Sequence, residues 1–171
     1  SHELRTPMTS IRAFSEILTE GDLPPEMVIR YGKIIHDEAK RLTRLLDDLL
    51  DLSVLENGSV QLNLGLASLQ GMIDTALTAA RQTRPDREFM VVRDLPSEAI
   101  YLKTDADRLT QVFINLISNA RKYCDAARPE LRIVVRQRSG RVTVDFIDNG
   151  KGIPKESQAL IFEKFARLTD A

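Results

Sequence analysis

The feature that most constrains the fold is a long run of helically spaced apolar residues that extends from about residue 25 to Glu56. Its members recur at alternating intervals of three and four residues for more than three heptads, with one carboxylate among them: Val28, Tyr31, Ile35, Glu38, Leu42, Leu45, Leu49 and Leu52. This spacing places them on one face of an α-helix and is typical of a coiled-coil seam. Asn57 and Gly58 favour the end of that helix.

A shorter amphipathic helix is predicted over residues 2–20, before a turn at 21–26 in which Pro25 suits the start of the next helix. The two helices therefore predict an antiparallel hairpin. The second helix also carries apolar residues outside the seam, namely Met27, Ile34, Leu46 and Leu50. Because one antiparallel neighbour would not cover this wider face, we expect two hairpins to form a dimeric four-helix bundle. The alternative is a monomeric hairpin packed against the rest of the chain.

The two helices differ in length by roughly eleven residues, or about 16 Å at the rise of an α-helix. The C-terminal end of the second helix therefore lacks an antiparallel partner. We expect the natural protein to continue the first helix upstream of Ser1, and no initiator methionine opens the chain.

After Gly58 the pattern becomes mixed. Helices are predicted over residues 69–81 and 105–123. Strands are predicted over residues 60–64, 89–93, 100–103, 131–137 and 142–147, the last two forming a β-hairpin around Ser139-Gly140. Two helices against a mixed or antiparallel sheet make an α+β two-layer sandwich. The sequence thus predicts two domains, residues 1–57 and 58–171.

Composition excludes several classes of function. The 171 residues carry a net charge of −1 and no basic stripe interleaved with aromatics, so we expect no nucleic-acid partner. The single cysteine, Cys124, cannot form an internal disulfide and favours the cytoplasm. Two histidines and one cysteine cannot assemble a transition-metal cluster. No segment approaches the roughly 20 apolar residues of a membrane span, so this part of the protein is expected to make no membrane contact.

A reactive grouping lies at the start of the first helix, in Ser1-His2-Glu3-Leu4-Arg5-Thr6-Pro7. His2 and Thr6 share a helix face, with Glu3 about 100° round the helix. Pro7 has no N–H for the carbonyl of Glu3 and favours a kink there. A histidine beside a carboxylate is a candidate reactive site; it is also a common solvated surface pair.

The predicted helix 105–123 has a polar edge. Asn115 and Asn119 lie four residues apart, followed by Lys122 and Tyr123. Carboxamide oxygens on one face can accept a Mg²⁺ ion that keeps most of its waters and bridges phosphate oxygens, and a lysine adds positive charge. Alternatively, the asparagines only bond to nearby backbone.

The segment Asp148-Asn149-Gly150-Lys151-Gly152-Ile153-Pro154 follows a predicted strand directly. Gly150 and Gly152 let the backbone approach a planar ligand, and the Asp148 carboxylate can accept from an exocyclic amine. Asp-Asn-Gly is also an ordinary turn sequence. Further on, Phe162 and Phe165 could form a lid over a nucleotide or belong to the core of a short helix.

Taken together, these segments resemble the sensor histidine kinases of two-component signalling. Four motifs occur in the order of that family: an H-box at residues 1–7, an N-box at 107–123, a G1 box at 148–152 and an F-box at 161–165. The resemblance implies a dimerisation and histidine-phosphotransfer domain followed by a catalytic ATP-binding domain of the Bergerat type.

The resemblance also implies roles for individual residues of the first domain. His2 would be the phosphoacceptor, and Glu3 the neighbour that takes the imidazole proton. Thr6 would help to orient the water that dephosphorylates a response regulator. The implied activity is ATP-dependent autophosphorylation of His2 and transfer of the phosphoryl group to an aspartate of that regulator.

In the second domain, Asn119 would be the Mg²⁺ ligand. Asn115 and Lys122 would lie on the phosphate side of ATP, Tyr123 near the nucleotide, and Asp148 against the adenine amine. The residues implied for the pocket wall and the edge of the ATP lid are Gly150, Gly152, Ile153, Phe162 and Phe165.

The chain also departs from the family pattern. A second glycine-rich box would follow the F-box, and the sequence ends at Ala171 before it. Cys124 stands where the family often has threonine or serine, and the sequence assigns it no role. Two other functions fit parts of the pattern. A Bergerat-type clamp ATPase shares the helix that carries Asn115 and Asn119 and the turn at residues 148–152, which we call the glycine turn. It does not share His2 or the helical hairpin. A non-catalytic dimeric scaffold would dock a regulator without using ATP.

Overall fold

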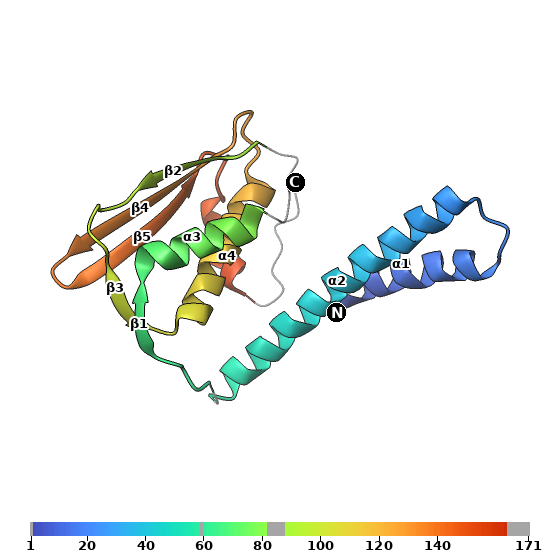
Figure 1. The fold of residues 1–171 in the computed structure, drawn as a ribbon, viewed down its shortest axis with the longest axis horizontal. Coiled ribbons are helices and arrows are strands. Elements are labelled where there is room, and N and C mark those ends of the chain that lie inside the picture. The colour runs from blue at the N-terminus through green and yellow to red at the C-terminus, as the bar shows by residue number, and fades with distance from the viewer. Residues whose placement is uncertain (1, 59, 82–87, 164–171) are drawn as a thin grey trace. The chain divides into compact units, whose positions relative to one another are not determined.

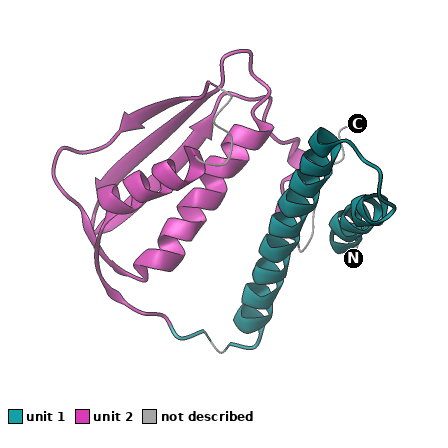
Figure 2. Cartoon of the chain, turned by 45° about the vertical axis from the view of Figure 1, so that its right-hand side comes forward, with its two compact units in different colours: residues 1–61 teal, residues 62–171 magenta. Residues whose placement is uncertain are grey.

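The computed structural model describes residues 2–58, 60–81 and 88–163. The chain divides into two compact units, residues 1–61 and 62–171 (Figure 2). The point of division lies a few residues beyond the boundary predicted from the change of hydrophobic pattern.

The first unit is a helical hairpin of α1, His2–Thr19, and α2, Pro25–Glu56. Gly21 and Asp22 both adopt positive φ in the turn between them, and Pro25 occupies the first position of α2. The rings of Phe14 and Tyr31 pack with centroids 5.1 Å apart, which places the middle of α1 against the first half of α2. The predicted hairpin is confirmed (Figure 1).

The long helix is poorly covered within one chain. No residue of α2 is buried, although Tyr31, Ile35, Leu42 and most other seam positions are partly covered. Of the apolar residues outside the seam, Met27 and Ile34 are also partly covered, whereas Leu46 and Leu50 are 46% and 65% exposed. A wide apolar face of this kind needs a further neighbour to exclude water.

The second unit begins with β1, Gly65–Ser68, and α3, Leu69–Arg81, followed by β2, Met90–Asp94, and β3, Tyr101–Thr104. It continues with α4, Ala106–Tyr123, the hairpin of β4, Glu130–Arg138, and β5, Arg141–Asp148, and short 3₁₀ turns at Lys155–Ser157 and Leu160–Phe162. β2, β4 and β5 form one mixed sheet in that order, with β2 parallel and β5 antiparallel to β4, while β1 pairs antiparallel with β3. The helices α3 and α4 lie on one side of the three-stranded sheet (Figure 1), as an α+β two-layer sandwich requires.

The core of this unit lies between the helices and β4. Five large side chains from these elements have 0–1% of their surface exposed, namely Leu69, Ile73, Ile117, Leu131 and Ile133. They come from the apolar stripes that predicted the helices and from the inward positions of the hairpin. At its tip, Ser139 and Gly140 both adopt positive φ, as a tight two-residue β-turn requires.

The strand predicted over residues 60–64 is wrong, and the strand lies instead at 65–68. β3 offers only four residues, which pair from Gly65 with Thr104 to Ser68 with Tyr101. The preceding residues are held differently, because the N–H of Asn63 donates to Oδ2 of Asp105 at 3.0 Å. The alternating residues of 60–64 therefore have no strand to join.

Asp105 also forms the N-cap of α4, because its Oδ1 accepts from the N–H of Arg108 at 3.2 Å. Hydrogen bonds from the backbone of Asn63 and then of Arg108 to this carboxylate lower the pKa of Asp105.

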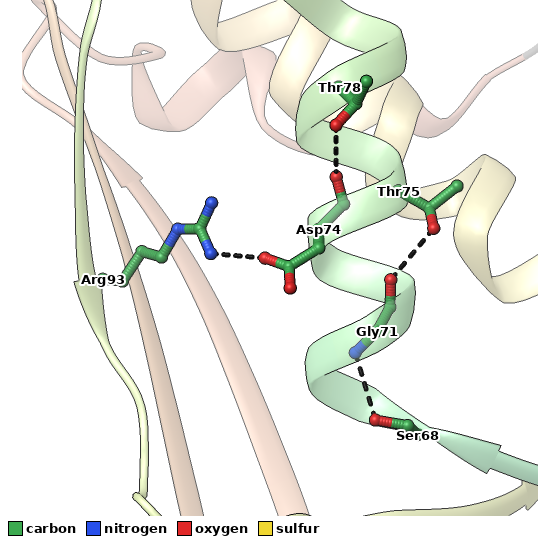
Figure 3. A network of polar contacts seen from close by, with 6 residues as sticks. All are labelled: Ser68, Gly71, Asp74, Thr75, Thr78 and Arg93. Atoms are coloured by element: carbon green, nitrogen blue, oxygen red, sulfur yellow. Dashed lines mark hydrogen bonds and ion pairs between the residues drawn. The ribbon is translucent and has the colours of Figure 1, made fainter.

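A polar network fixes α3 to the sheet edge (Figure 3). Ser68 accepts from the N–H of Gly71 at 3.1 Å, which satisfies a donor of the first turn of α3. Further along the helix, the carboxylate of Asp74 pairs with Arg93 of β2. Among the described residues, no helix combines the length and apolar character that a bilayer span requires.

Candidate functional site

The candidate reactive residues lie together on the first turns of α1. His2 begins the helix and is exposed, Glu3 is partly covered, and Thr6 lies one turn further on with its hydroxyl donating to the carbonyl oxygen of His2 at 3.1 Å. Pro7 is buried and lies within the helix. The imidazole is therefore open to an incoming substrate, while the Thr6 hydroxyl is engaged with the backbone of the same turn.

The polar edge of α4 faces solvent. Asn115, Asn119, Lys122 and Tyr123 are all exposed, whereas Phe113, Ile117 and Ala120 face the core. The helical spacing alone accounts for this separation, because positions 113, 117 and 120 form the opposite stripe.

Two contacts orient side chains on this edge. Oδ1 of Asn115 accepts from Gln111 at 3.0 Å, and Nζ of Lys122 lies 4.7 Å from the centroid of the Tyr123 ring. The edge thus presents a carboxamide at Asn119 and a cation near the C-terminal end of the helix. The side-chain oxygens of Asn115 and Asn119 are exposed on this edge. Within the described ranges no three His, Cys, Asp or Glu residues are grouped to hold a metal.

The glycine turn follows β5 directly, as predicted. Asp148 is the last residue of the strand, and its Oδ1 accepts from the N–H of Gly150 at 2.8 Å. A Cβ on Gly150 would lie 2.9 Å from that oxygen and 3.3 Å from Cα of Cys124, so a side chain would displace the turn. Gly152 has a φ of +76°, which disfavours other residues. Ile153 follows and is 41% exposed.

The sequence did not assign the residue between Asp148 and Gly150. Oδ1 of Asn149 accepts from Sγ of Cys124 at 3.2 Å and from the N–H of Glu130 at 2.8 Å, and its Nδ2 donates to the carbonyl of Arg128 at 2.9 Å. The sequence indicates only that Asn149 lies in a turn, where asparagine side chains commonly bond to backbone. It does not indicate the partners of Asn149, which lie about twenty residues away along the chain.

The predicted lid residues are only partly described. Phe162 ends the second 3₁₀ turn and is 88% exposed, so it is not a core residue of the described unit. Phe165 lies outside the described residues. A small open cavity of about 190 Å³ lies between residues 63–67 and 104–107, and none of the predicted nucleotide residues lines it.

Comparison with known proteins finds a match to a domain family in each of the two units. Residues 1–58 match the His Kinase A (phospho-acceptor) domain, and residues 104–171 match the histidine kinase-, DNA gyrase B-, and HSP90-like ATPase family. The sensor protein kinase WalK of Staphylococcus aureus is 35% identical over 173 residues, which is 100% of this chain but 41% of that protein. The chain thus spans less than half the length of the curated relatives it matches.

Among solved structures, the histidine kinase AdeS of Acinetobacter baumannii has a TM-score of 0.77 and 30% identity, over 91% of this chain and 76% of that one. The histidine kinase ThkA, solved in complex with the response regulator protein TrrA, has a TM-score of 0.77 at 24% identity, over 97% of this chain and 48% of the ThkA chain, and supports the fold. The order of motifs, the two domain matches and the likeness to AdeS together show that the chain belongs to the sensor histidine kinases.

Proposed function

We propose that the chain is a kinase core that transfers the γ-phosphoryl group of ATP to His2 and then to an aspartate of a response regulator. The observation that carries the proposal is the meeting of two segments in the second unit. The Asp148–Gly152 turn lies against the residue that follows α4, with Cα of Cys124 3.3 Å from a Cβ built on Gly150. An adenine acceptor and a phosphate-binding helix end are thereby neighbours.

The chemical step is an in-line displacement. One imidazole nitrogen of His2 forms a bond to the γ-phosphorus as the bond from that phosphorus to the bridging oxygen breaks, and ADP leaves with the electron pair. Glu3 lies beside His2 and accepts the proton from the other ring nitrogen. Because little covalent chemistry falls to the protein in such transfers, positioning and charge neutralisation by Lys122 supply most of the rate.

Asn119 is proposed as the Mg²⁺ ligand. Its exposed carboxamide suits a hard cation that keeps most of its waters, and Asn115 lies one turn away on the same edge. When bound, Mg²⁺ neutralises charge on the transferring phosphate. Asn115 and Lys122 then contact phosphate oxygens, and Phe162 and Phe165 form the edge of a lid over the nucleotide.

The partners follow from the first unit. The open apolar face of α2 supports a homodimer through a four-helix bundle, and the exposed helix surface around His2 supports docking of a receiver domain. Thr6 would also act in dephosphorylation of the regulator, after its hydroxyl leaves the His2 carbonyl to bind water. We place this part of the protein in the cytoplasm, where ATP and receiver domains occur.

A label-transfer assay tests the proposal. The complete protein is incubated with γ-labelled ATP and Mg²⁺, and wild type is compared with His2→Ala, Asn119→Ala and the matched control His36→Ala, which removes the only other histidine. We expect acid-labile, base-stable label on wild type and His36→Ala, and its loss in the other two. ATP turnover that survives His2→Ala would favour a clamp ATPase, and absence of ATP binding would favour a scaffold.

A further inference from the structure

The side chain of Asn149 joins the glycine turn to the loop between α4 and β4. Asn149 uses both ends of its carboxamide, accepting from Cys124 and from the N–H of Glu130 and donating to the carbonyl of Arg128. Its three bonds thus reach the first residue of the loop, the second-to-last residue of the loop and the first residue of β4. A side chain that spans a loop in this way fixes the position of the turn relative to the end of α4.

A second set of contacts joins the same two segments independently. Oδ1 of Asp125 accepts from the N–H of Lys151 at 3.0 Å, and the two side chains lie 4.0 Å apart as an ion pair. The missing side chain of Gly150 lets the turn approach the loop, because a Cβ there would lie 3.3 Å from both Oδ1 of Asp125 and Cα of Cys124. We call the Asn149 and Asp125 contacts together the loop clamp.

We propose that Asn149 is a positioning residue for base recognition, which holds Asp148 in register with the phosphate-binding end of α4. The inference rests on the proposed function. A nucleotide reaches from Asp148 at its base to Lys122 and Asn119 at its phosphates, so the two protein segments must keep a fixed separation while it binds. Asn149 is adjacent to Asp148, and Cys124 is two residues beyond Lys122.

The loop clamp also orients the carboxylate of Asp148, which is proposed to bind the adenine amine. Oδ1 of Asp148 already accepts from the N–H of Gly150, the residue that follows Asn149. A shift of the turn therefore moves the whole carboxylate with its backbone. Because a hydrogen bond to a charged group weakens steeply with distance and angle, a loosened turn loses preference for a base that carries an amine.

The same geometry gives Cys124 a function as the clamp's thiol donor. Its side chain is 3% exposed and directed at Oδ1 of Asn149. A serine hydroxyl at this position would donate to the same oxygen, whereas an alanine would not. Cys124→Ser and Cys124→Ala therefore form a matched pair that separates hydrogen bonding from packing.

The test compares ATP with purine riboside triphosphate, which lacks the exocyclic amine, in binding to the complete protein. We expect wild type to prefer ATP by about tenfold or more, the range for a hydrogen bond to a charged group. Asn149→Ala should bring that ratio close to one, as should Asp148→Ala, while the protein stays folded by circular dichroism. Cys124→Ser should retain the ratio and Cys124→Ala should lower it.

Amide hydrogen exchange in the nucleotide-free protein supplies a readout that does not depend on ATP. We expect Asn149→Ala to speed exchange at Glu130 and Lys151, whose N–H groups bond within the clamp. The control is Asn63→Ala, because the Asn63 side chain makes no hydrogen bond within the described part of the chain.

A wild-type base preference that persists in Asn149→Ala, with unchanged exchange at both amides, would overturn the inference and leave the proposed function intact. A wild-type protein without any preference for the amine-bearing base would overturn the inference together with the role of Asp148 in binding adenine, whereas failure of the label-transfer assay would overturn the proposed function itself.

Discussion

The open face of α2 leads to a quantitative prediction about the dimer. Leu46 and Leu50 are 46% and 65% exposed in a single chain. Complete burial of a leucine contributes roughly 1.5–3 kcal/mol, so covering the exposed part of each contributes about 1 kcal/mol or slightly more. A symmetric dimer holds four such side chains, and because alanine still buries its β-carbon, their replacement by alanine should weaken association by about 3–4 kcal/mol. The dissociation constant should therefore rise roughly 100- to 1,000-fold.

Sedimentation equilibrium over a range of protein concentrations measures this change. The double variant Leu46→Ala/Leu50→Ala is compared with wild type and with Leu66→Ala, which makes one such truncation at a 77% exposed leucine on β1. We expect the double variant to be monomeric at protein concentrations at which wild type and Leu66→Ala are dimeric, while its helix content is unchanged. A dissociation constant within about threefold of wild type, well below the change worked from burial, would refute the assignment of this face to a dimer contact.

Three further predictions concern stability and activity. Ile133→Ala removes a fully buried side chain of β4 and should lower the free energy of unfolding by about 2–5 kcal/mol, as measured by urea denaturation. The lowered pKa of Asp105 means that its ionised form stabilises the fold at pH values above its ordinary pKa of 3.8, and that this contribution is lost as pH falls through the folded pKa. The stability difference between wild type and Asp105→Asn should accordingly be constant from pH 5 to 7 and shrink below about pH 4; a difference unchanged down to pH 2 would contradict this. Thr6→Ala should retain label on His2 but slow dephosphorylation of the regulator, and an unchanged dephosphorylation rate would exclude the role proposed for Thr6.

The helices could be predicted because apolar residues at intervals of three and four residues indicate an α-helix and not a strand. In α4 the stripe at Phe113, Ile117 and Ala120 is buried and the edge at Asn115 and Asn119 is exposed, and both follow from spacing alone. The hairpin of β4 and β5 was equally readable, since Ser139 and Gly140 suit its turn.

The strand error at residues 60–64 had a different origin. Alternation predicts a strand only where a partner is available, and β3 ends at Thr104, because Asp105 begins the next helix and binds Asn63. The loop clamp was likewise hidden, because the bonds of Asn149 reach Cys124 and Arg128 from more than twenty residues away in sequence. Contacts that depend on where distant segments meet leave no local pattern.

The central claim is tested most directly by locating the phosphoryl group. The complete protein is incubated with ATP and Mg²⁺, digested at neutral to alkaline pH, and analysed by mass spectrometry for phosphopeptides. We expect a phosphohistidine at His2 and none at His36, and we expect the phosphohistidine to disappear in Asn119→Ala. Phosphate on another residue, or an unmodified His2 in protein that hydrolyses ATP, would contradict it.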